Sequence, residues 1–220
     1  MAGQGEGRAA TGGGRAGQAS RRSGAMRDEV IAFKRERILE EAAAAFYEHG
    51  YQGTTLEAVA TRLGVTKPFI YYHFRNKAEI LSEICRRGIT EAVAALDAAQ
   101  AAEGTPDQRL AAAIEAITRT VLEQQAYTAI YFREEKNYPA DDAVELNRRR
   151  KAFDHKLSAL LEEGVAAGVF EIEDVRLTAL AIGGMISWAF TWYNPQGRLS
   201  TAEICRRMAG LVLRMVRRPE

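Results

Sequence analysis

The sequence has few cysteines, no long apolar run and no catalytic signature, and each absence excludes a class of protein. Cys85 and Cys205 are its only cysteines, and neither has another cysteine or a histidine at ligand spacing. This argues against a disulfide framework, a redox switch or a metal site. No stretch of 18 apolar residues occurs, so we expect no membrane span. The motifs GxSxG, GxxxxGK[ST], HExxH and CxxC are also missing, and no expected strand and helix frame the Gly-rich residues 11–14 as a phosphate-binding loop, so we expect neither an enzyme nor a bound cofactor.

The chain also lacks a strong excess of either charge. Its formal net charge is +1; residues 1–80 carry 12 Lys and Arg against 9 Asp and Glu, and residues 81–220 carry 18 against 20. A protein that coats nucleic acid through bulk charge would be far more basic. Any nucleic-acid contact must therefore depend on cations placed locally, which favours a specific site.

Residues 1–28 have a different composition from the rest of the chain. They are rich in Gly, Ala, Ser and Arg and contain no apolar run, so we expect a disordered arm without a secretory signal. Two interpretations stay open. Arg21, Arg22 and Arg27 could follow DNA next to the first helix, or the arm could be a solvated tail, with Met26 as an alternative start.

Residues 54–81 predict two short helices joined by a tight turn. Leu56, Val59 and Leu63 recur at helical spacing, so one face of the first helix can be buried. Gly64 suits a turn that needs a positive φ. Thr66 then serves as the N-cap of the second helix, because Pro68 fits the first helical turn without losing a hydrogen bond.

The second short helix is aromatic and basic. Six large side chains occupy positions 69–74, and no acidic residue occurs between positions 61 and 78. Such a short helix cannot bury all six, so we expect Ile70 and Phe74 in the core and several of the others outside. For His73, a structural role and a phosphate contact both stay open. An exposed aromatic and basic helix suits the major groove of DNA.

Residues 30–81 closely resemble the DNA-binding domain of the TetR/AcrR family of transcriptional regulators. The resemblance rests on an amphipathic first helix, Gly50-Tyr51, Thr54-Thr55, Leu63-Gly64-Val65, and Tyr71-Tyr72-His73-Phe74 followed by Asn76-Lys77. It implies a helix-turn-helix domain at residues 29–77, in which Thr55 and Lys77 contact phosphate. The full set of DNA-binding positions expected on this basis is Thr55, Thr66, Lys67, Pro68, Phe69, Tyr71, Tyr72, His73 and Lys77.

The rest of the chain predicts helices only, so the fold class is all-α, with about nine helices and a second domain at residues 78–217. We expect helices near residues 78–101, 107–125, 127–133, 140–167, 174–193 and 201–217. The breaks fall at Gly104-Thr105-Pro106, Asn137-Tyr138-Pro139, Gly168 and Asn194-Pro195.

The last two helices predict a homodimer. Residues 174–193 carry too many apolar side chains for one buried stripe, and a second apolar face usually means a second neighbour. Gly183 and Gly184 favour a close helix contact. In TetR-like proteins these helices pair across a two-fold axis, and two recognition helices then read a palindromic operator. The dimerisation positions expected are Gly183, Gly184, Met185, Leu211 and Val212. The alternative is one monomeric core.

Aromatic residues outside the first domain gather in two segments, residues 126–138 and 187–193. Aromatic walls with polar tips suit a small organic effector, although an ordinary aromatic core is the alternative. The effector-binding positions expected are Tyr127, Tyr131, Phe132, Arg133, Arg149, Trp188 and Trp192.

The segment IGGMISWAFTWYNPQGRLS resembles the C-terminal helices of TetR-family regulators of fatty-acid, steroid and aromatic-acid degradation, whose ligands are acyl-CoA thioesters. This resemblance implies a cytoplasmic homodimeric repressor that a hydrophobic effector such as an acyl-CoA releases from its operator. Two alternatives stay open. One is a TetR-type repressor that responds to drugs or free acids, and the other is a binding module whose C-terminal half recruits another protein.

Overall fold

The computed structural model describes residues 13–218, with side chains from residue 24 onward. This part of the chain is helical apart from one isolated bridge between Phe170 and Arg217, which confirms the all-α fold class. The α-helices are α1 Gly13–Gly53, α2 Leu56–Leu63, α3 Lys67–His73, α4 Lys77–Ala101, α5 Pro106–Glu123, α6 Gln125–Arg133, α7 Ala140–Ala166, α8 Val175–Ser187 and α9 Thr201–Val216. Short 3-10 helices occur at Glu135–Asn137 (η1) and Trp188–Thr191 (η2).

The first domain is a small unit of three helices. The second half of α1 buries Ile38 and Phe46 against α2, and Ile70 and Phe74 close the same core from α3 and its C-cap. Gly64 joins α2 to α3 with φ 67°, the left-handed conformation that glycine adopts without strain. The predicted turn and the predicted placement of Ile70 and Phe74 in the core are thus confirmed.

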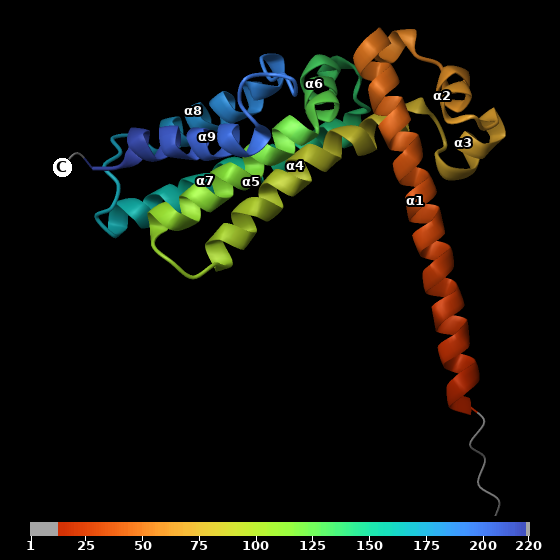
Figure 1. Ribbon diagram of the computed structural model, residues 1–220, viewed down its shortest axis with the longest axis horizontal. Helices are drawn as coiled ribbons and strands as arrows, with labels where there is room; N and C mark the ends of the chain where they lie inside the picture. Colours follow the sequence, from red (N-terminus) through yellow and green to blue (C-terminus); the bar gives the residue numbers. More distant parts are fainter. Residues whose placement is uncertain (1–12, 219–220) are drawn as a thin grey trace, which may run out of the picture.

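The first half of α1 differs from the predicted disordered arm. The helix begins at Gly13 and projects away from the rest of the molecule (Figure 1). Residues 24–34 of this projection are all exposed, so no buried side chain holds it to the rest of the molecule. Its Ala and Arg residues are good helix formers, and they extend a helix whose packed half is already formed. Residues 1–12 of the predicted arm lie outside the described residues.

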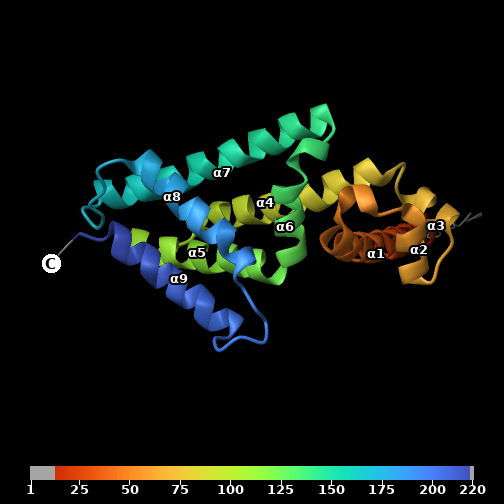
Figure 2. The same cartoon turned by 90° about the horizontal axis from the view of Figure 1, so that it is seen from above.

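Helices α4–α9 form the second domain around one continuous core. Helix α5 packs along α9, and α4 packs against α5 and α7 (Figure 2). Leu96, Ile114, Leu157, Ile182 and Val212 are fully buried at these contacts. Helix α4 begins directly after the first domain, so it connects the two halves of the molecule. None of the helices in residues 13–218 is long and apolar enough to cross a membrane.

The predicted helix at residues 174–193 is shorter in the structure. Helix α8 ends at Ser187, and residues 188–191 form the 3-10 helix η2. A 3-10 helix has three residues per turn, so side chains after Ser187 leave the face that an α-helix would give them. This change moves both tryptophans away from their expected positions.

Candidate DNA-binding surface and effector cavity

Helix α3 presents an aromatic surface to solvent. Tyr71 and Tyr72 are 48% and 77% exposed, and Pro68 and Thr66 are exposed at the start of the helix. Thr66 is the N-cap residue, but its hydroxyl makes no capping hydrogen bond. Because the opposite side of α3 is fixed in the core through Ile70, these outward side chains are held on a rigid element.

Thr55 and Lys67 border this surface with polar groups. The Thr55 hydroxyl accepts a hydrogen bond from Ala58 N at 3.1 Å, caps α2, and stays exposed with its own proton free to donate. Lys67 forms an ion pair with Glu57, which raises the pKa of Lys67. A DNA phosphate would therefore have to replace Glu57 as the partner of this ammonium group.

Two of the expected DNA-binding side chains, His73 and Lys77, make contacts within the protein in this structure. The His73 side chain is buried, with 7% exposed, and its ring lies edge-on to Phe69 and Tyr72. Burial and the charges of Lys34 and Arg35 lower its pKa, so the ring is neutral and turned away from solvent. Phe69 is partly buried in the same packing.

Lys77 is the second of these side chains. Its ammonium group donates to the carbonyl oxygens of Tyr51 and Thr54, at 2.7 and 2.8 Å, and lies 4.3 Å from the centroid of the Tyr51 ring. These carbonyls lie at the C-terminal end of α1, which attracts a cation through the helix dipole. Lys77 therefore joins α1 to the start of α4.

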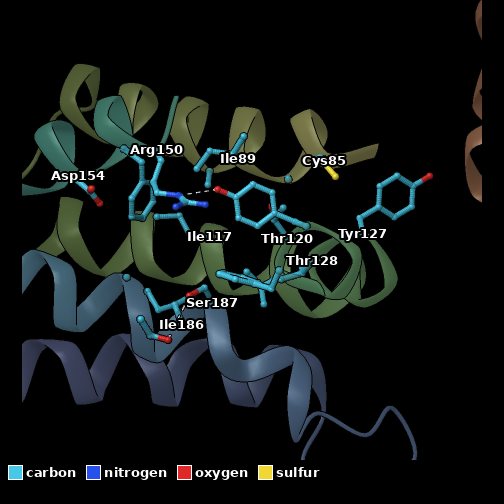
Figure 3. A pocket seen from close by; sticks show the side chains of 18 of the residues that line it. Cys85, Ile89, Ile117, Thr120, Tyr127, Thr128, Arg150, Asp154, Ile186 and Ser187 are labelled. Atoms are coloured by element: carbon cyan, nitrogen blue, oxygen red, sulfur yellow. Dashed lines mark hydrogen bonds between the residues drawn. The ribbon is translucent and has the colours of Figure 1, made fainter. Parts of the chain in front are cut away.

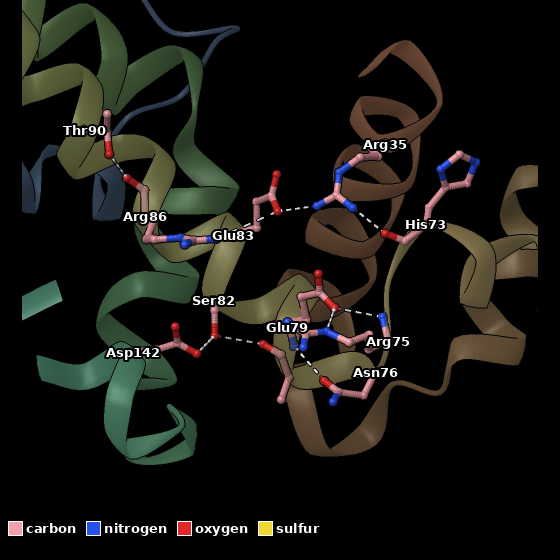
Figure 4. A network of polar contacts seen from close by, with 11 residues as sticks. Arg35, His73, Arg75, Asn76, Glu79, Ser82, Glu83, Arg86, Thr90 and Asp142 are labelled. Carbon is pink, nitrogen blue, oxygen red and sulfur yellow. Dashed lines mark hydrogen bonds and ion pairs between the residues drawn. The ribbon is translucent and has the colours of Figure 1, made fainter. Parts of the chain in front are cut away.

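The junction between the two domains contains two ion pairs between α1 and α4. Arg35 donates to the backbone carbonyl of His73, at the end of α3, and to Glu83 Oε2 at 2.5 Å (Figure 4). One turn further along α4, Arg87 pairs with Glu36 of α1. We call Arg35, Glu36, Glu83 and Arg87 the α1–α4 clamp; it ties the recognition helix to the first turns of α4.

A second connection joins the end of α1 to the end of α6. Tyr51 N donates to Glu134 Oε1 at 3.1 Å, and Gln52 Nε2 donates to Asn137 Oδ1 at 2.8 Å. Glu134 and Asn137 directly follow α6. A displacement of α6 would therefore also displace or break these hydrogen bonds to the C-terminal end of α1.

A cavity of about 290 Å³ lies inside the second domain, between α4, α5, α6, α7 and α8. Its wall is mainly apolar, and the lining residues include Cys85, Ile89, Ile117, Tyr127, Phe132, Phe153 and Leu180. Tyr127 and Cys85 lie toward one end and Arg150 and Asp154 toward the other (Figure 3). Cys85 is a buried free thiol, and burial raises its pKa to about 12, so it acts as an apolar wall residue.

Arg150 and Asp154 make one end of this cavity polar. Arg150 Nε donates to the Tyr131 hydroxyl at 2.9 Å, and its guanidinium lies 3.6 Å from Glu135. Asp154 lies one turn later on α7, and burial raises the pKa of its carboxyl group. The cavity thus combines a long apolar wall with one polar end, as ligand pockets generally do.

The Tyr127 end of the cavity touches the α1–α4 clamp. The Arg87 guanidinium lies 5.4 Å from the centroid of the Tyr127 ring, a cation–π contact, while the same group pairs with Glu36. Tyr127 lines the cavity. Arg87 therefore lies between the cavity wall and α1 and contacts both.

The expected effector residues divide into two groups. Tyr127, Tyr131 and Phe132 line the cavity, whereas Arg133, Arg149, Trp188 and Trp192 do not. Arg133 lies over the Tyr47 ring, and Arg149 faces α4, where it donates to the Thr90 hydroxyl at 2.8 Å. The two tryptophans are 59% and 53% exposed because α8 ends before them.

Asp154 and Arg150 line the cavity, although neither is among the effector-binding positions expected from the sequence. Neighbouring positions on a helix differ by about 100°. Positions 149 and 150 are both within one turn of the buried Leu146 and Phe153, so the helical phase does not decide between them. Which of the two arginines faces the cavity depends on where α4 and α6 lie beside α7.

The expected dimerisation residues lie in different environments, some exposed and some inside their own protomer. Leu211 is 44% exposed, but Val212 is fully buried in the core of its own protomer, and Gly183 and Gly184 line the cavity. Met185 is half-buried against the same core. The exposed apolar side chains of α8, η2 and α9 are Leu177, Leu180, Trp188, Trp192, Leu211 and Met215.

A helix-turn-helix domain joined to an all-α domain with an internal cavity defines a class of ligand-responsive DNA-binding regulators. Residues 38–84 match the model of bacterial regulatory proteins of the tetR family, and residues 103–216 match that of the tetracyclin repressor-like C-terminal domain. The chain belongs to the TetR family of transcriptional regulators, as the sequence predicted. It is a regulator and not an enzyme.

Individual relatives agree with this assignment. The chain is 27% identical over 186 residues to the HTH-type transcriptional repressor KstR2 of Mycolicibacterium smegmatis, covering 83% of this chain and 90% of that protein. The crystal structure of PfmR from Thermus thermophilus is 33% identical, has a TM-score of 0.75, and is matched over 81% of this chain and 97% of PfmR. AibR in complex with isovaleryl coenzyme A and operator DNA shares the fold, with a TM-score of 0.69, 24% identity, and coverage of 81% and 97%.

Proposed function

We propose that the protein is a cytoplasmic homodimeric repressor that leaves a palindromic operator when a hydrophobic effector, such as an acyl-CoA thioester, enters the cavity. The observation that carries this proposal is the contact between the cavity and the α1–α4 clamp. Tyr127 belongs to the cavity wall, and Arg87 links its ring to Glu36 of α1. An effector that moves Tyr127 must therefore disturb the element that supports the recognition helix.

The exposed face of α3 supports sequence-specific DNA binding. Thr66, Pro68, Tyr71 and Tyr72 are presented on the outside of a helix of 7 residues, which reaches few base edges. Two copies related by a two-fold axis would lengthen the site to two half-sites about 34 Å apart, or one turn of duplex. In this proposal Thr55 and Lys67 approach the flanking phosphates.

The exposed side chains of α8 and α9 support the dimer. Leu177 and Leu180 are exposed one turn apart on α8, Trp188 is exposed at the start of η2, and Leu211 and Met215 are exposed one turn apart on α9. Exposed large apolar side chains that gather on a protein surface mark an interaction site. A second copy of the same helices would bury them on both sides of a two-fold axis.

The size of the cavity constrains the effector. A volume of about 290 Å³ is at the lower end of the range for small-molecule pockets, roughly 300–1,000 Å³. It accommodates an acyl group, whereas the nucleotide of coenzyme A would have to stay outside. The isovaleryl coenzyme A bound by AibR is consistent with an effector of this kind.

Release from DNA would follow from linkage between the two sites. An effector that prefers a different placement of α4 and α6 lowers operator affinity by its differential affinity for the two arrangements. The two routes to α1 are the α1–α4 clamp and the hydrogen bonds of Glu134 and Asn137.

The proposal is tested by selecting operator DNA from a random pool and titrating the complex with short-chain, long-chain, steroid-like and aromatic acyl-CoAs. We expect at least one thioester to lower operator affinity about tenfold or more, the range of typical allosteric coupling. If every thioester leaves operator affinity unchanged while a drug-like compound or a free acid lowers it, the effector class is wrong and the regulator class stands.

A further inference from the structure

The polar end of the cavity contains a carboxylate without a partner. Asp154 lines the cavity on α7, and among the described residues no hydrogen bond or ion pair reaches its side chain within bonding distance. Partial burial solvates this carboxylate less well than an exposed one, and the pKa of its carboxyl group is raised accordingly. A bound molecule that supplies a donor at this position would therefore gain binding free energy.

The cations nearest to Asp154 do not provide that donor. Arg150 is committed to the Tyr131 hydroxyl and to Glu135, while Arg176 of α8 and His155 act on Asp154 only through their charge. Burial remains the largest influence on the carboxyl group and raises its pKa. At neutral pH this end of the cavity thus presents an acceptor at Asp154 beside donors at Arg150 and Tyr131.

An acceptor at Asp154 beside donors at Arg150 and Tyr131 discriminates between polar head groups of an effector. A free carboxylate would bring a second negative charge next to Asp154, which costs binding free energy. A secondary amide offers an N–H to Asp154 and a carbonyl to Arg150 or Tyr131 without adding charge. The pantetheine arm of an acyl thioester contains such amides a short spacer beyond the thioester, whereas a free fatty acid has none.

We propose that Asp154, together with Arg150, makes the cavity select amide-bearing acyl thioesters over the free carboxylic acids with the same acyl chain. This inference rests on the proposed function and assigns the selectivity of the cavity mainly to the Asp154 carboxylate. Asp154 makes the contact with the amide N–H, and the apolar wall holds the acyl chain.

Binding of two matched ligand series to the full-length protein tests this selectivity. The probes are straight-chain acyl-pantetheines and the free carboxylates of the same chain lengths, measured by calorimetry with Asp154→Asn, with wild type, and with Glu162→Gln. The last is an exposed acid on the same helix and serves as the matched control. Thermal unfolding of each variant confirms that it is folded.

We expect Asp154→Asn to change the two affinities in opposite directions. The loss of a charged acceptor should weaken acyl-pantetheine binding about fivefold, and the removal of repulsion should strengthen carboxylate binding about fivefold. Glu162→Gln should change neither. A structural role for Asp154 would weaken both series together, and that result would overturn the proposal.

Other outcomes separate this inference from the proposed function. If wild type binds acyl-pantetheines and Asp154→Asn leaves the ratio of the two affinities unchanged, the inference fails and the effector class stands. If the ratio changes as expected but acyl-CoAs do not release the operator, the selectivity stands and the proposed effector role fails. Wild-type binding of the free carboxylates alone, or of neither series, overturns the inference.

Discussion

The DNA-binding surface and the effector cavity differ in how the chain builds them. The exposed face of α3 comes from a few consecutive residues supported by a small core, and every outward side chain lies within residues 55–72. The cavity draws its wall from five helices, from Cys85 on α4 to Ser187 on α8. The shape of a surface built from neighbouring residues depends on those residues alone. The shape of a cavity built from distant helices changes whenever one of these helices moves. This difference suits a switch, because a ligand that shifts one of these helices changes the cavity, while the α3 surface moves as a unit.

The largest expected effect concerns the stability of the second domain alone. A Cβ atom at Gly164 would overlap the ring of the buried Phe170, so Gly164→Ala should lower the free energy of unfolding by about 3 kcal/mol. Gly88→Ala is the matched control, because a Cβ there meets nothing within 4 Å. It should leave stability unchanged or raise it by about 1 kcal/mol. Denaturant titrations compare the two variants, and equal stabilities would show that Phe170 moves aside freely.

The next effect concerns the local DNA-binding surface. Replacing both Tyr71 and Tyr72 with alanine should lower operator affinity about a hundredfold, since each removes a contact worth roughly 1–3 kcal/mol. Both side chains are exposed, so stability should change by less than about 0.5 kcal/mol per substitution. Gel-shift titration measures the affinity. Unchanged affinity with intact folding would remove these tyrosines from the interface.

The third effect concerns the proposed dimer. Leu177→Glu combined with Leu211→Glu places charges among the exposed side chains of α8 and α9, and should weaken dimerisation about thirtyfold. Val165→Glu, at a 38% exposed apolar position on α7, is the control. Light scattering across a concentration series gives the dissociation constant. A wild-type protein that is monomeric at micromolar concentration would contradict the dimer itself.

The smallest effect concerns the contact between the two regions. Arg87→Gln removes the ion pair with Glu36 and the cation that lies over Tyr127, without changing a residue of the cavity wall. Effector affinity should change less than about threefold, whereas the effector-induced loss of operator affinity should shrink about tenfold. Arg119→Gln, which breaks an exposed pair with Glu123 on α5, is the control. Full coupling in Arg87→Gln would exclude the α1–α4 clamp as the route.

Features that depend on neighbouring residues could be predicted from the sequence. The turn at Gly64, the start of α3 at Thr66-Lys67-Pro68 and the burial of Ile70 and Phe74 all follow from local spacing and turn chemistry. The family itself follows from the same segment. Tyr127, Tyr131 and Phe132, expected from the aromatic clusters of the sequence to bind an effector, do line the cavity.

Features that depend on long-range packing could not be predicted. Lys77 binds carbonyls of a segment 23 and 26 residues earlier, and Arg35 reaches the carbonyl of a residue 38 positions away. Nothing near Lys77 in the sequence distinguishes a lysine that binds carbonyls from one that binds phosphate. The exposed Trp188 and Trp192 result from the early end of α8, a choice between two helical forms that composition does not fix.

The central claim is that the cavity and the recognition helix share one conformational equilibrium. Reciprocal linkage tests this claim most directly. The affinity of an active acyl-CoA is measured by calorimetry for the free protein and for its operator complex. The account predicts that operator DNA weakens effector binding by the same factor, about tenfold or more, by which the effector weakens operator binding. Equal effector affinities for the free and the DNA-bound protein would contradict it.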